Sequence, residues 1–519
     1  MRQRALHSSP LKSPVKQEPA DPVDIDMAIQ HGRRTAPNGI HRKGHSDEFD
    51  GEEVDMSMLD DEDEESDSDD DDDYDQPIAP VVHVEVRLSD DSRVIGSVIE
   101  SNLLPMLRQA YEWVPPATFV PERYWADIPI LGRNVAQIYI AECDASVEAV
   151  TADFRIHTYR ASDRPVTHIT GGLDEDEDDS RTSAATICEL PSRLHEGLWD
   201  SLVYPDDIKE KLLTYIHSTS LFAENEVDFN VISWNRLILL YGPPGTGKTS
   251  LCRALAQKLS IRMSETYSRG QLVEINSHSL FSKWFSESGK LVQKLFDDVT
   301  DLAEDDECLV VVMIDEVESL TAARLGAMNG NEPSDALRVV NALLTQLDKL
   351  KSRKNVLVMT TSNLAGSIDS AFVDRADIKQ YVGLPPVAAI YWILSSCLQA
   401  LGDADLAPGA KHLLKWSDCI LARGVLPLSE KKRVNRAREA SYKLREIAER
   451  CHELELSGRF LRKVPVMAHA RYLAGRAGGR ASLDRWMEAL GKAVEDERLA
   501  RELVNQAEGK HSVKSKPQA

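Results

Sequence analysis

Apolar and polar positions change their spacing along the chain, and the first regular pattern begins near residue 81. In "VVHVEVRLS", Val82, Val84 and Val86 alternate with polar residues. This period of two predicts a strand with one buried face, and "VAQIYIAEC" and "ADFRIHTYR" show similar spacing. We therefore expect a small α+β domain over residues 80–195, interrupted by the acidic segment 173–180.

From residue 199 the pattern becomes an alternation of strands and helices. Short apolar runs, "RLILLYG", "LVEIN", "CLVVVMIDE" and "NVLVMTTSN", are separated by helical patterns such as "KTSLCRALAQKL" and "DALRVVNALLTQLDKL". "CLVVVMIDE" is apolar on both faces, as a central parallel strand requires. The pattern predicts a parallel α/β sheet over residues 196–385, with a ligand site at the carboxyl ends of its strands. Only helical patterns follow, which predicts a helical domain over 386–505.

The two ends of the chain are polar and carry much of its charge. The formal net charge is -24, and residues 47–75 hold 19 acidic residues with no Lys or Arg. Segments 1–79 and 506–519 cannot bury enough apolar surface to offset their ordering entropy, so we expect them to be disordered. The remainder is only mildly acidic. We therefore expect no direct contact with nucleic acid.

Cysteine spacing and apolar run lengths bear on the compartment. The seven cysteines are scattered and form no CxxC pair, which favours reduced thiols over a disulfide framework or a zinc site. The first residues lack the apolar segment of a secretory signal. No run reaches the ~20 apolar residues of a membrane-spanning helix. We expect a soluble intracellular protein without a membrane partner.

A complete phosphate-binding loop, "GPPGTGKT", joins the strand "RLILLYG" to the following helix. Glycines at such a turn let backbone N–H groups surround a phosphate, and the helix N-terminus adds its dipole. We expect Lys248 to reach the β- and γ-phosphates and Thr249 to bind Mg²⁺. The expected nucleotide-binding residues are Gly242, Pro243, Pro244, Gly245, Thr246, Gly247, Lys248, Thr249 and Ser250.

Polar side chains end the two neighbouring strands. "VVVMIDE" places two carboxylates at a strand end: Asp315 is expected to hold Mg²⁺, and Glu316 to polarise the attacking water as general base. Asn363 ends the next strand and is expected to orient that water beside the γ-phosphate. Guanine specificity usually shows an NKxD element, which this sequence lacks. ATP and Mg²⁺ are the expected substrate and cofactor.

This combination of motifs resembles the AAA+ ATPases. The resemblance implies that "FVDRADIKQY" carries an arginine finger, Arg375, which reaches a neighbour's γ-phosphate in a homo-hexameric ring. The family's usual pattern has a second arginine a few residues further on, whereas Ala376, Asp377 and Ile378 follow here, so the existence of a second finger is left open. "LSGRFLRKVP" resembles the lid's sensor-two motif, with Arg459 as the residue expected there and Arg462 as the alternative. The segment from 198, "LWDSLVYPDDIKEKLL", resembles the one that packs beside the adenine.

Longer motifs resemble the pachytene checkpoint protein two family. They include "GQLVEINSHSLFSKWFSESGKLV", "IDEVESLTAARLG" and "EPSDALRVVNALLTQLD". The resemblance implies a ring ATPase that remodels HORMA-domain proteins of the meiotic chromosome axis and the spindle checkpoint, directly or through a HORMA-like adaptor. It implies a pull on the N-terminal segment of the HORMA domain, and a location in the nucleus, on meiotic chromosomes, or in the cytoplasm.

The aromatic pair in "SKWFSES" acquires a role from this resemblance. In AAA+ rings this connection faces the central pore, so Lys283, Trp284 and Phe285 are expected to grip a substrate chain. The same stretch resembles the pore loop of microtubule-severing AAA ATPases, which is the alternative function. Those enzymes carry a basic linker, whereas the region before this ATPase domain is acidic. A non-hydrolysing scaffold is disfavoured by the intact Lys248 and Glu316.

Overall fold

The computed structural model describes most of the chain after residue 78. The described residues are 79–141, 147–170, 183–205, 207–228, 231–277, 288–319, 335–363, 368, 370–421, 432–474 and 480–513. The expected pore-loop residues Lys283, Trp284 and Phe285, and the acidic segment 173–180, lie outside these ranges. None of the helices within the described ranges is both long and apolar enough to cross a membrane.

The N-terminal domain is built around a four-stranded sheet of order β3-β4-β1-β6. The central strand β1 pairs antiparallel with β4 and parallel with β6. Val82, Val84 and Val86 are fully buried, as their alternation predicts. The domain's elements are β1 (Val81–Leu88), α1 (Gly96–Ala110), β2 (Trp113–Val114), β3 (Thr118–Phe119), η1 (Glu122–Tyr124), α2 (Pro129–Asn134), β4 (Val135–Ile140), β5 (Val147–Glu148) and β6 (Asp153–Tyr159).

A seven-stranded sheet of order β13-β9-β12-β11-β10-β8-β7 forms the ATPase domain. The five strands from β13 to β10 run parallel, which confirms the predicted parallel sheet. The elements are β7 (Thr167–Thr170), β8 (Ser183–Leu190), η2 (Arg193–His195), α3 (Ile208–Glu224), β9 (Leu237–Tyr241), α4 (Lys248–Arg262), β10 (Arg269–Asn276), α6 (Ser288–Leu302), β11 (Cys308–Asp315), α8 (Asp335–Leu350), β12 (Val356–Ser362), α9 (Ser370–Val373) and β13 (Ile378–Tyr381).

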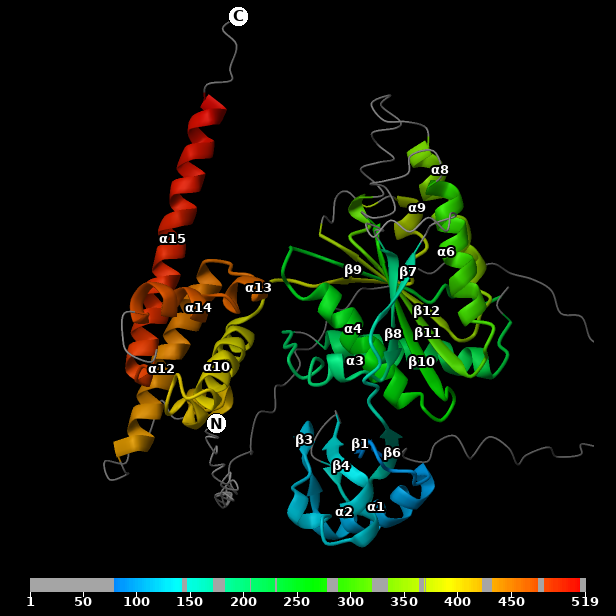
Figure 1. Ribbon diagram of the computed structural model, residues 1–519, viewed down its shortest axis with the longest axis horizontal. Coiled ribbons are helices and arrows are strands. Elements are labelled where there is room, and N and C mark those ends of the chain that lie inside the picture. The colour runs from blue at the N-terminus through cyan, green and yellow to red at the C-terminus, as the bar shows by residue number, and fades with distance from the viewer. Residues whose placement is uncertain are drawn as a thin grey trace, which may run out of the picture. The chain divides into compact units, whose positions relative to one another are not determined.

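Alternate residues of the central strands face two different cores. On β11, Val310, Val312 and Ile314 pack with α6 and α8, whereas Leu309 and Val311 pack with α3 and α4. Figure 1 shows these two helix pairs on opposite sides of the strands. A doubly covered parallel sheet of this kind presents only its strand ends to ligands.

The boundary between the first two domains differs from the expected one. Strands β7 and β8 lie within the segment 80–195, yet β8 pairs antiparallel with β10 and β7 pairs with β8. By strand pairing, the N-terminal domain therefore ends before β7. The physical reason is that β10 would otherwise be an open edge of the sheet, and β8 satisfies its backbone groups.

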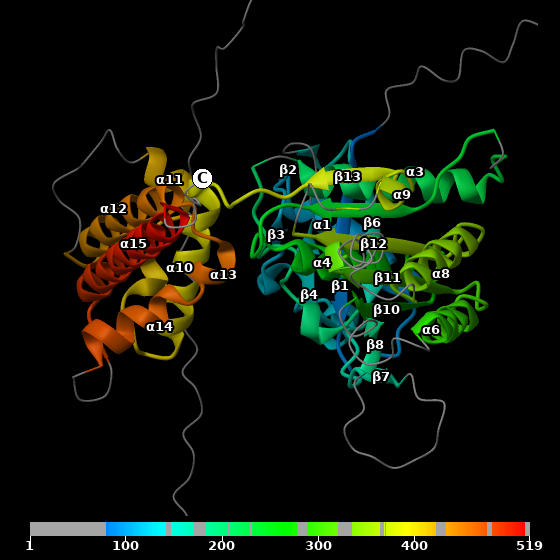
Figure 2. The same cartoon turned by 90° about the horizontal axis from the view of Figure 1, so that it is seen from above.

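The helical domain is a bundle whose members gather around one core (Figure 2). Trp486 and Tyr391 are its largest fully buried side chains. Its last helix continues to Val513, beyond the expected end of the domain at 505. The elements are α10 (Val387–Asp403), η3 (Ala410–His412), α11 (Trp416–Leu421), α12 (Lys432–Glu453), α13 (Gly458–Leu461), α14 (Val464–Ala468), η5 (His469–Leu473) and α15 (Leu483–Val513).

Candidate nucleotide site

The phosphate loop leaves β9 and turns directly into α4. Gly242, Gly245 and Gly247 have φ angles of 148°, 78° and 98°, a region that favours glycine. A Cβ at Gly242 would lie 2.2 Å from the carbonyl oxygen of Val382, so no side chain fits there. The backbone at Val382 therefore packs closely against Gly242, whose N–H donates to the Ser362 carbonyl oxygen at 3.2 Å. The N-terminus of α4, which follows the loop, offers N–H groups to an anion.

Lys248, the first residue of α4, points back into this loop. Its side chain is 5% exposed, and Nζ donates to the carbonyl oxygens of Gly242 and Pro243 at 2.8 Å each. Burial lowers the pKa of the Lys248 ammonium group, while nearby carboxylates, Glu318 first, oppose that shift. The buried cation is thus held where a phosphate would offer it a stronger acceptor than a carbonyl.

Thr249 and Asp315 meet across the gap between α4 and β11. Thr249 Oγ1 donates to Asp315 Oδ1 at 3.0 Å and lies 3.2 Å from Oδ2. Thr361 on β12 also donates to Oδ1 of Asp315. A hydroxyl and a carboxylate are oxygen ligands of the kind that Mg²⁺ takes beside nucleotide phosphates. The residues present therefore fit a magnesium ion.

The backbone of Glu316 adopts an unusual conformation. Its φ is 59°, and its N–H donates to Thr361 Oγ1 at 3.2 Å. Its carbonyl oxygen accepts from the hydroxyls of Ser277 at 2.8 Å and Ser319 at 2.9 Å. A non-glycine residue in this region persists only where its surroundings over-determine it, and such residues cluster at functional sites.

Asn363 follows β12, which lies between the loop strand β9 and the Asp-Glu strand β11. Its Nδ2 donates to Glu318 Oε1 at 2.9 Å, and its backbone N–H donates to the same oxygen at 3.2 Å. The other carboxylate oxygen of Glu318 is buried and has no hydrogen-bond partner within the described ranges. The structure therefore brings Asn363 to the candidate nucleotide site together with a carboxylate, Glu318, to which no sequence motif assigns a role.

The two arginines occupy different places. Arg459 lies at the loop: its backbone N–H donates to the Gly245 carbonyl at 3.3 Å, and its charge acts on Lys248. Arg375 instead pairs with Asp348 on α8, at 2.8 Å for the closest atoms. The structure therefore groups Arg459 with the loop residues and holds Arg375 within its own chain.

The segment before α3 lines the other side of the loop. A Cβ at Gly247 would lie 3.4 Å from both the Leu202 side chain and the Tyr204 hydroxyl. The Tyr204 hydroxyl is buried and has no hydrogen-bond partner within the described part of the chain. An apolar side chain beside an unpaired donor suits a nucleoside that stacks and accepts a hydrogen bond. Only the resemblance of the 198 segment pointed to these two residues.

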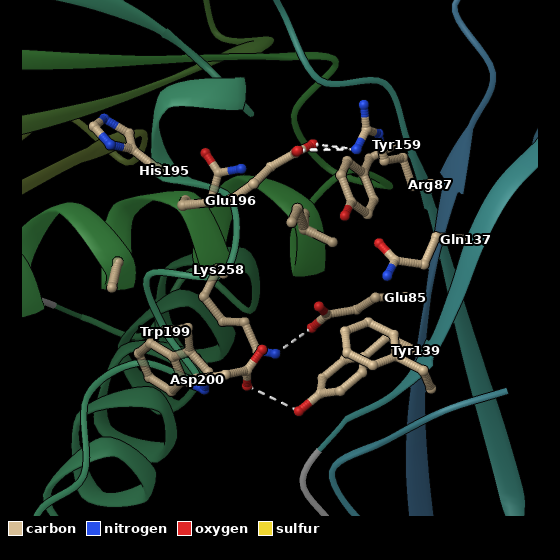
Figure 3. Close-up of a pocket in the computed structure, with 15 residues that line it drawn as sticks. Glu85, Arg87, Gln137, Tyr139, Tyr159, His195, Glu196, Trp199, Asp200 and Lys258 are labelled. Carbon is tan, nitrogen blue, oxygen red and sulfur yellow. Dashed lines mark hydrogen bonds and ion pairs between the residues drawn. The ribbon is translucent and has the colours of Figure 1, made fainter. Parts of the chain in front are cut away.

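Helix α4 also carries the contact between the ATPase domain and the N-terminal domain (Figure 3). Lys258 Nζ lies 2.6 Å from Glu85 Oε1, and both side chains are nearly fully buried. Arg262 lies 3.7 Å from the same oxygen. Tyr139 donates to Asp200 at 2.9 Å beside this pair. Sequence patterns could not have predicted the Glu85–Lys258 ion pair. Glu85 occupies a polar position of an alternating strand, and Lys258 occupies an ordinary position in a helix.

Two histidines extend this contact. His83 Nδ1 and His157 Nε2 are 2.9 Å apart, and the rings stack at 5.2 Å. Burial, followed by the charge of Arg262, lowers the pKa of His83 to about 3 and that of His157 to about 4. Both imidazoles are therefore neutral near pH 7, so one ring nitrogen can donate to the other.

Comparisons with known proteins agree with this architecture. The model of the ATPase family associated with various cellular activities (AAA) matches residues 238–384. The TRIP13-like AAA+ ATPase lid C-terminal domain matches 386–498, and the TRIP13 N-terminal domain matches 78–164. The solved structure of C. elegans PCH-2 shares 32% identity, covers 81% of this chain and 100% of that one, and has a TM-score of 0.62.

Two relatives extend the match over most of the chain. The pachytene checkpoint protein 2 homolog of Mus musculus is 42% identical over 431 residues, which is 80% of this chain and 93% of the relative. The homolog of Xenopus tropicalis is 43% identical over 429 residues, with the same two shares. The expected fold and ATPase activity are thereby confirmed. The chain belongs to the pachytene checkpoint protein 2 family of AAA ATPases.

Proposed function

We propose that this ATPase works as a homo-hexameric ring that remodels HORMA-domain proteins. The observation that carries the proposal is the family match, which extends over the N-terminal domain and the lid as well as the ATPase domain. The HORMA substrate is what membership in this family implies. We propose that the ring acts in meiotic recombination and checkpoint control, with the nucleus and meiotic chromosomes as its main location and the cytoplasm as a second one.

Each side chain around the phosphate loop has a proposed role in ATP hydrolysis. Lys248 binds the phosphates, and Thr249 and Asp315, which meet at 3.0 Å, would hold Mg²⁺. When bound, the ion neutralises phosphate charge. Glu316 accepts a proton from the attacking water as general base, and Asn363 orients that water. Tyr204 and Leu202 border the nucleoside.

Two further arginines complete the proposed site. Arg459 acts from the lid as sensor two, since its backbone already contacts the loop at Gly245. Arg375 acts on the γ-phosphate of a neighbouring subunit, which is consistent with its place away from the loop of its own chain. A finger that acts between subunits requires an oligomer in which each site faces a partner.

Lys283, Trp284 and Phe285 are proposed to grip the N-terminal segment of the substrate in the pore. Aromatic side chains bury a large area with few rotamers to freeze, so they can hold chains of many sequences. The variant Trp284→Ala should retain basal ATPase activity and lose remodelling. Loss of the folded state in this variant would instead assign the side chain to the core.

The decisive experiment measures ATP hydrolysis with and without a purified HORMA-domain protein, in its closed and open forms. We expect stimulation by the closed form and its conversion to the open form. Glu316→Gln should bind ATP and stop both processes, which separates remodelling from binding. Stimulation by tubulin and not by the HORMA protein would establish the severing alternative and end the present proposal.

A further inference from the structure

Glu318 stands out among the residues around the nucleotide site, because the sequence motifs assign it no task. It lies three positions after Asp315, and one oxygen of its carboxylate, Oε1, accepts two hydrogen bonds from Asn363. One comes from the backbone N–H and one from the side-chain Nδ2. Two donors from one residue fix both the backbone and the amide plane of Asn363 against this carboxylate.

The chemistry of a carboxylate decides which way that amide turns. An ionised carboxylate can only accept hydrogen bonds, so it must face the NH₂ of Asn363. The amide oxygen Oδ1 is then directed away from Glu318. An oxygen is what an attacking water needs as an acceptor for one of its hydrogens, whereas an NH₂ would repel that hydrogen. A glutamine at position 318 keeps one oxygen acceptor but loses the negative charge that strengthens both hydrogen bonds, so it would hold Asn363 less firmly.

Two further observations concern the Glu318 carboxylate. Glu318 is the first of the carboxylates that act on the Lys248 ammonium, ahead of Asp315 and Glu316. Its second oxygen, Oε2, is buried and has no hydrogen-bond partner within the described ranges. A buried, partly unsatisfied carboxylate costs stability, and such a cost is common where a group serves a site.

We infer that Glu318 is a positioning residue for ATP hydrolysis, which locks the carboxamide of Asn363 with its oxygen available to the attacking water. This inference rests on the proposed role of Asn363. Glu318 acts through that residue and does not itself contact the water. The carboxamide of Asn363 could otherwise rotate and exchange its oxygen and its NH₂. The hydrogen bonds to Glu318 explain why it keeps a single orientation toward the site.

The test compares Glu318→Gln, Asn363→Ala and the double variant in steady-state ATP hydrolysis. We expect kcat of Glu318→Gln to fall by about 10- to 100-fold, as for other misplaced catalytic geometry, with KM for ATP nearly unchanged. The double variant should be no slower than Asn363→Ala, because the two residues act as one unit. Glu318→Asp keeps the charge and should recover part of the rate.

Controls separate this inference from a loss of folding and from the proposed function itself. Glu307→Gln makes the same chemical change at the other end of β11 and should hydrolyse ATP normally. Binding of a fluorescent ADP analogue reports a folded site in each variant. If Asn363→Ala hydrolyses ATP normally, the role of Asn363 and this inference both fail. If Asn363→Ala is slow and Glu318→Gln is normal, or if their losses multiply, only the inference about Glu318 fails.

Discussion

Arg375 holds Asp348 through a bidentate ion pair, with Nε to Oδ1 at 3.0 Å and Nη2 to Oδ2 at 2.8 Å. A third donor, Nη1, contacts the carbonyl of Ala371 at 2.8 Å. These hydrogen bonds lower the pKa of Asp348 and fix the plane of the guanidinium group. The proposed finger is therefore presented by its own chain in one orientation.

Removal of the finger should stop hydrolysis without preventing nucleotide binding. We expect Arg375→Ala to lower kcat by about 10³-fold, the range found for arginine fingers. Affinity for ADP should stay close to that of the unaltered chain, because Arg375 does not contact the loop of its own chain. Mixing Arg375→Ala with Lys248→Ala subunits should restore activity at mixed interfaces. No restoration in rings shown to contain both variants would contradict a role between subunits.

Asp348→Asn tests whether the pair matters for orientation or only for stability. The carboxylate is 38% exposed, so its loss should change the free energy of unfolding by no more than about 1 kcal/mol. Hydrolysis should fall, by less than in Arg375→Ala, because the finger remains but is held less firmly. Steady-state kinetics and thermal unfolding, measured on the same variant, would separate the effect on the rate of hydrolysis from the effect on stability. A rate equal to that of the unaltered chain would mean that Asp348 does not orient the finger.

Glu85→Gln should be strongly destabilising, because it removes the carboxylate that pairs with the buried Lys258. Breaking one partner of a buried ion pair costs about 3 to 5 kcal/mol. The double variant Glu85→Gln, Lys258→Gln removes both charges and should lose less. Chemical denaturation measures the free energy of unfolding of the single and the double variant. The substitution of an exposed residue of the same domain, Glu112→Gln, is the matched control. An effect of Glu85→Gln as small as that of the control would overturn the prediction.

The His83–His157 pair predicts a loss of stability in acid. Both pKa values are lowered in the folded chain by burial and by Arg262, Lys258 and Arg155, so unfolding takes up protons below the ordinary histidine pKa of about 6.5. The contribution is fully present above that value and is lost as the pH falls through the folded-state pKa values of about 4 for His157 and about 3 for His83. Thermal unfolding of His83→Gln, His157→Gln should change less between about pH 7 and about pH 5 than that of the unaltered chain. Equal slopes would refute the prediction.

The fold and part of the site followed from the sequence because their signals are local. The loop residues are adjacent in the chain, and Asp315 and Asn363 end strands whose carboxyl ends must meet at one edge of a parallel sheet. The partners of Asn363 and Arg375 could not be found in this way. Glu318 and Asp348 are single acidic residues among 85, and only the folded chain shows which of them meet these two side chains.

The domain boundary expected at residue 195 differs from the observed one for a related reason. The residues of β7 and β8 carry no information about which sheet these strands join. Pairing of Ile187 with Val273 puts β8 beside β10, a partner more than eighty positions away, and β7 then pairs with β8. Likewise, Lys258 in "ALAQKLSIR" looks like a solvated lysine until the N-terminal domain covers it.

Helix α4 has a consequence for anyone who wishes to build chimaeras from this protein. It starts with Lys248 at the phosphate loop and carries Lys258 about 15 Å further on, at 1.5 Å per residue. An N-terminal domain transplanted from another ATPase would have to bring an acid to the place of Glu85, or remove the carboxylate that pairs with Lys258 on the helix that begins at the phosphate loop. The smallest exchangeable unit is therefore the N-terminal domain together with α4, and a cut between them would sever a matched pair.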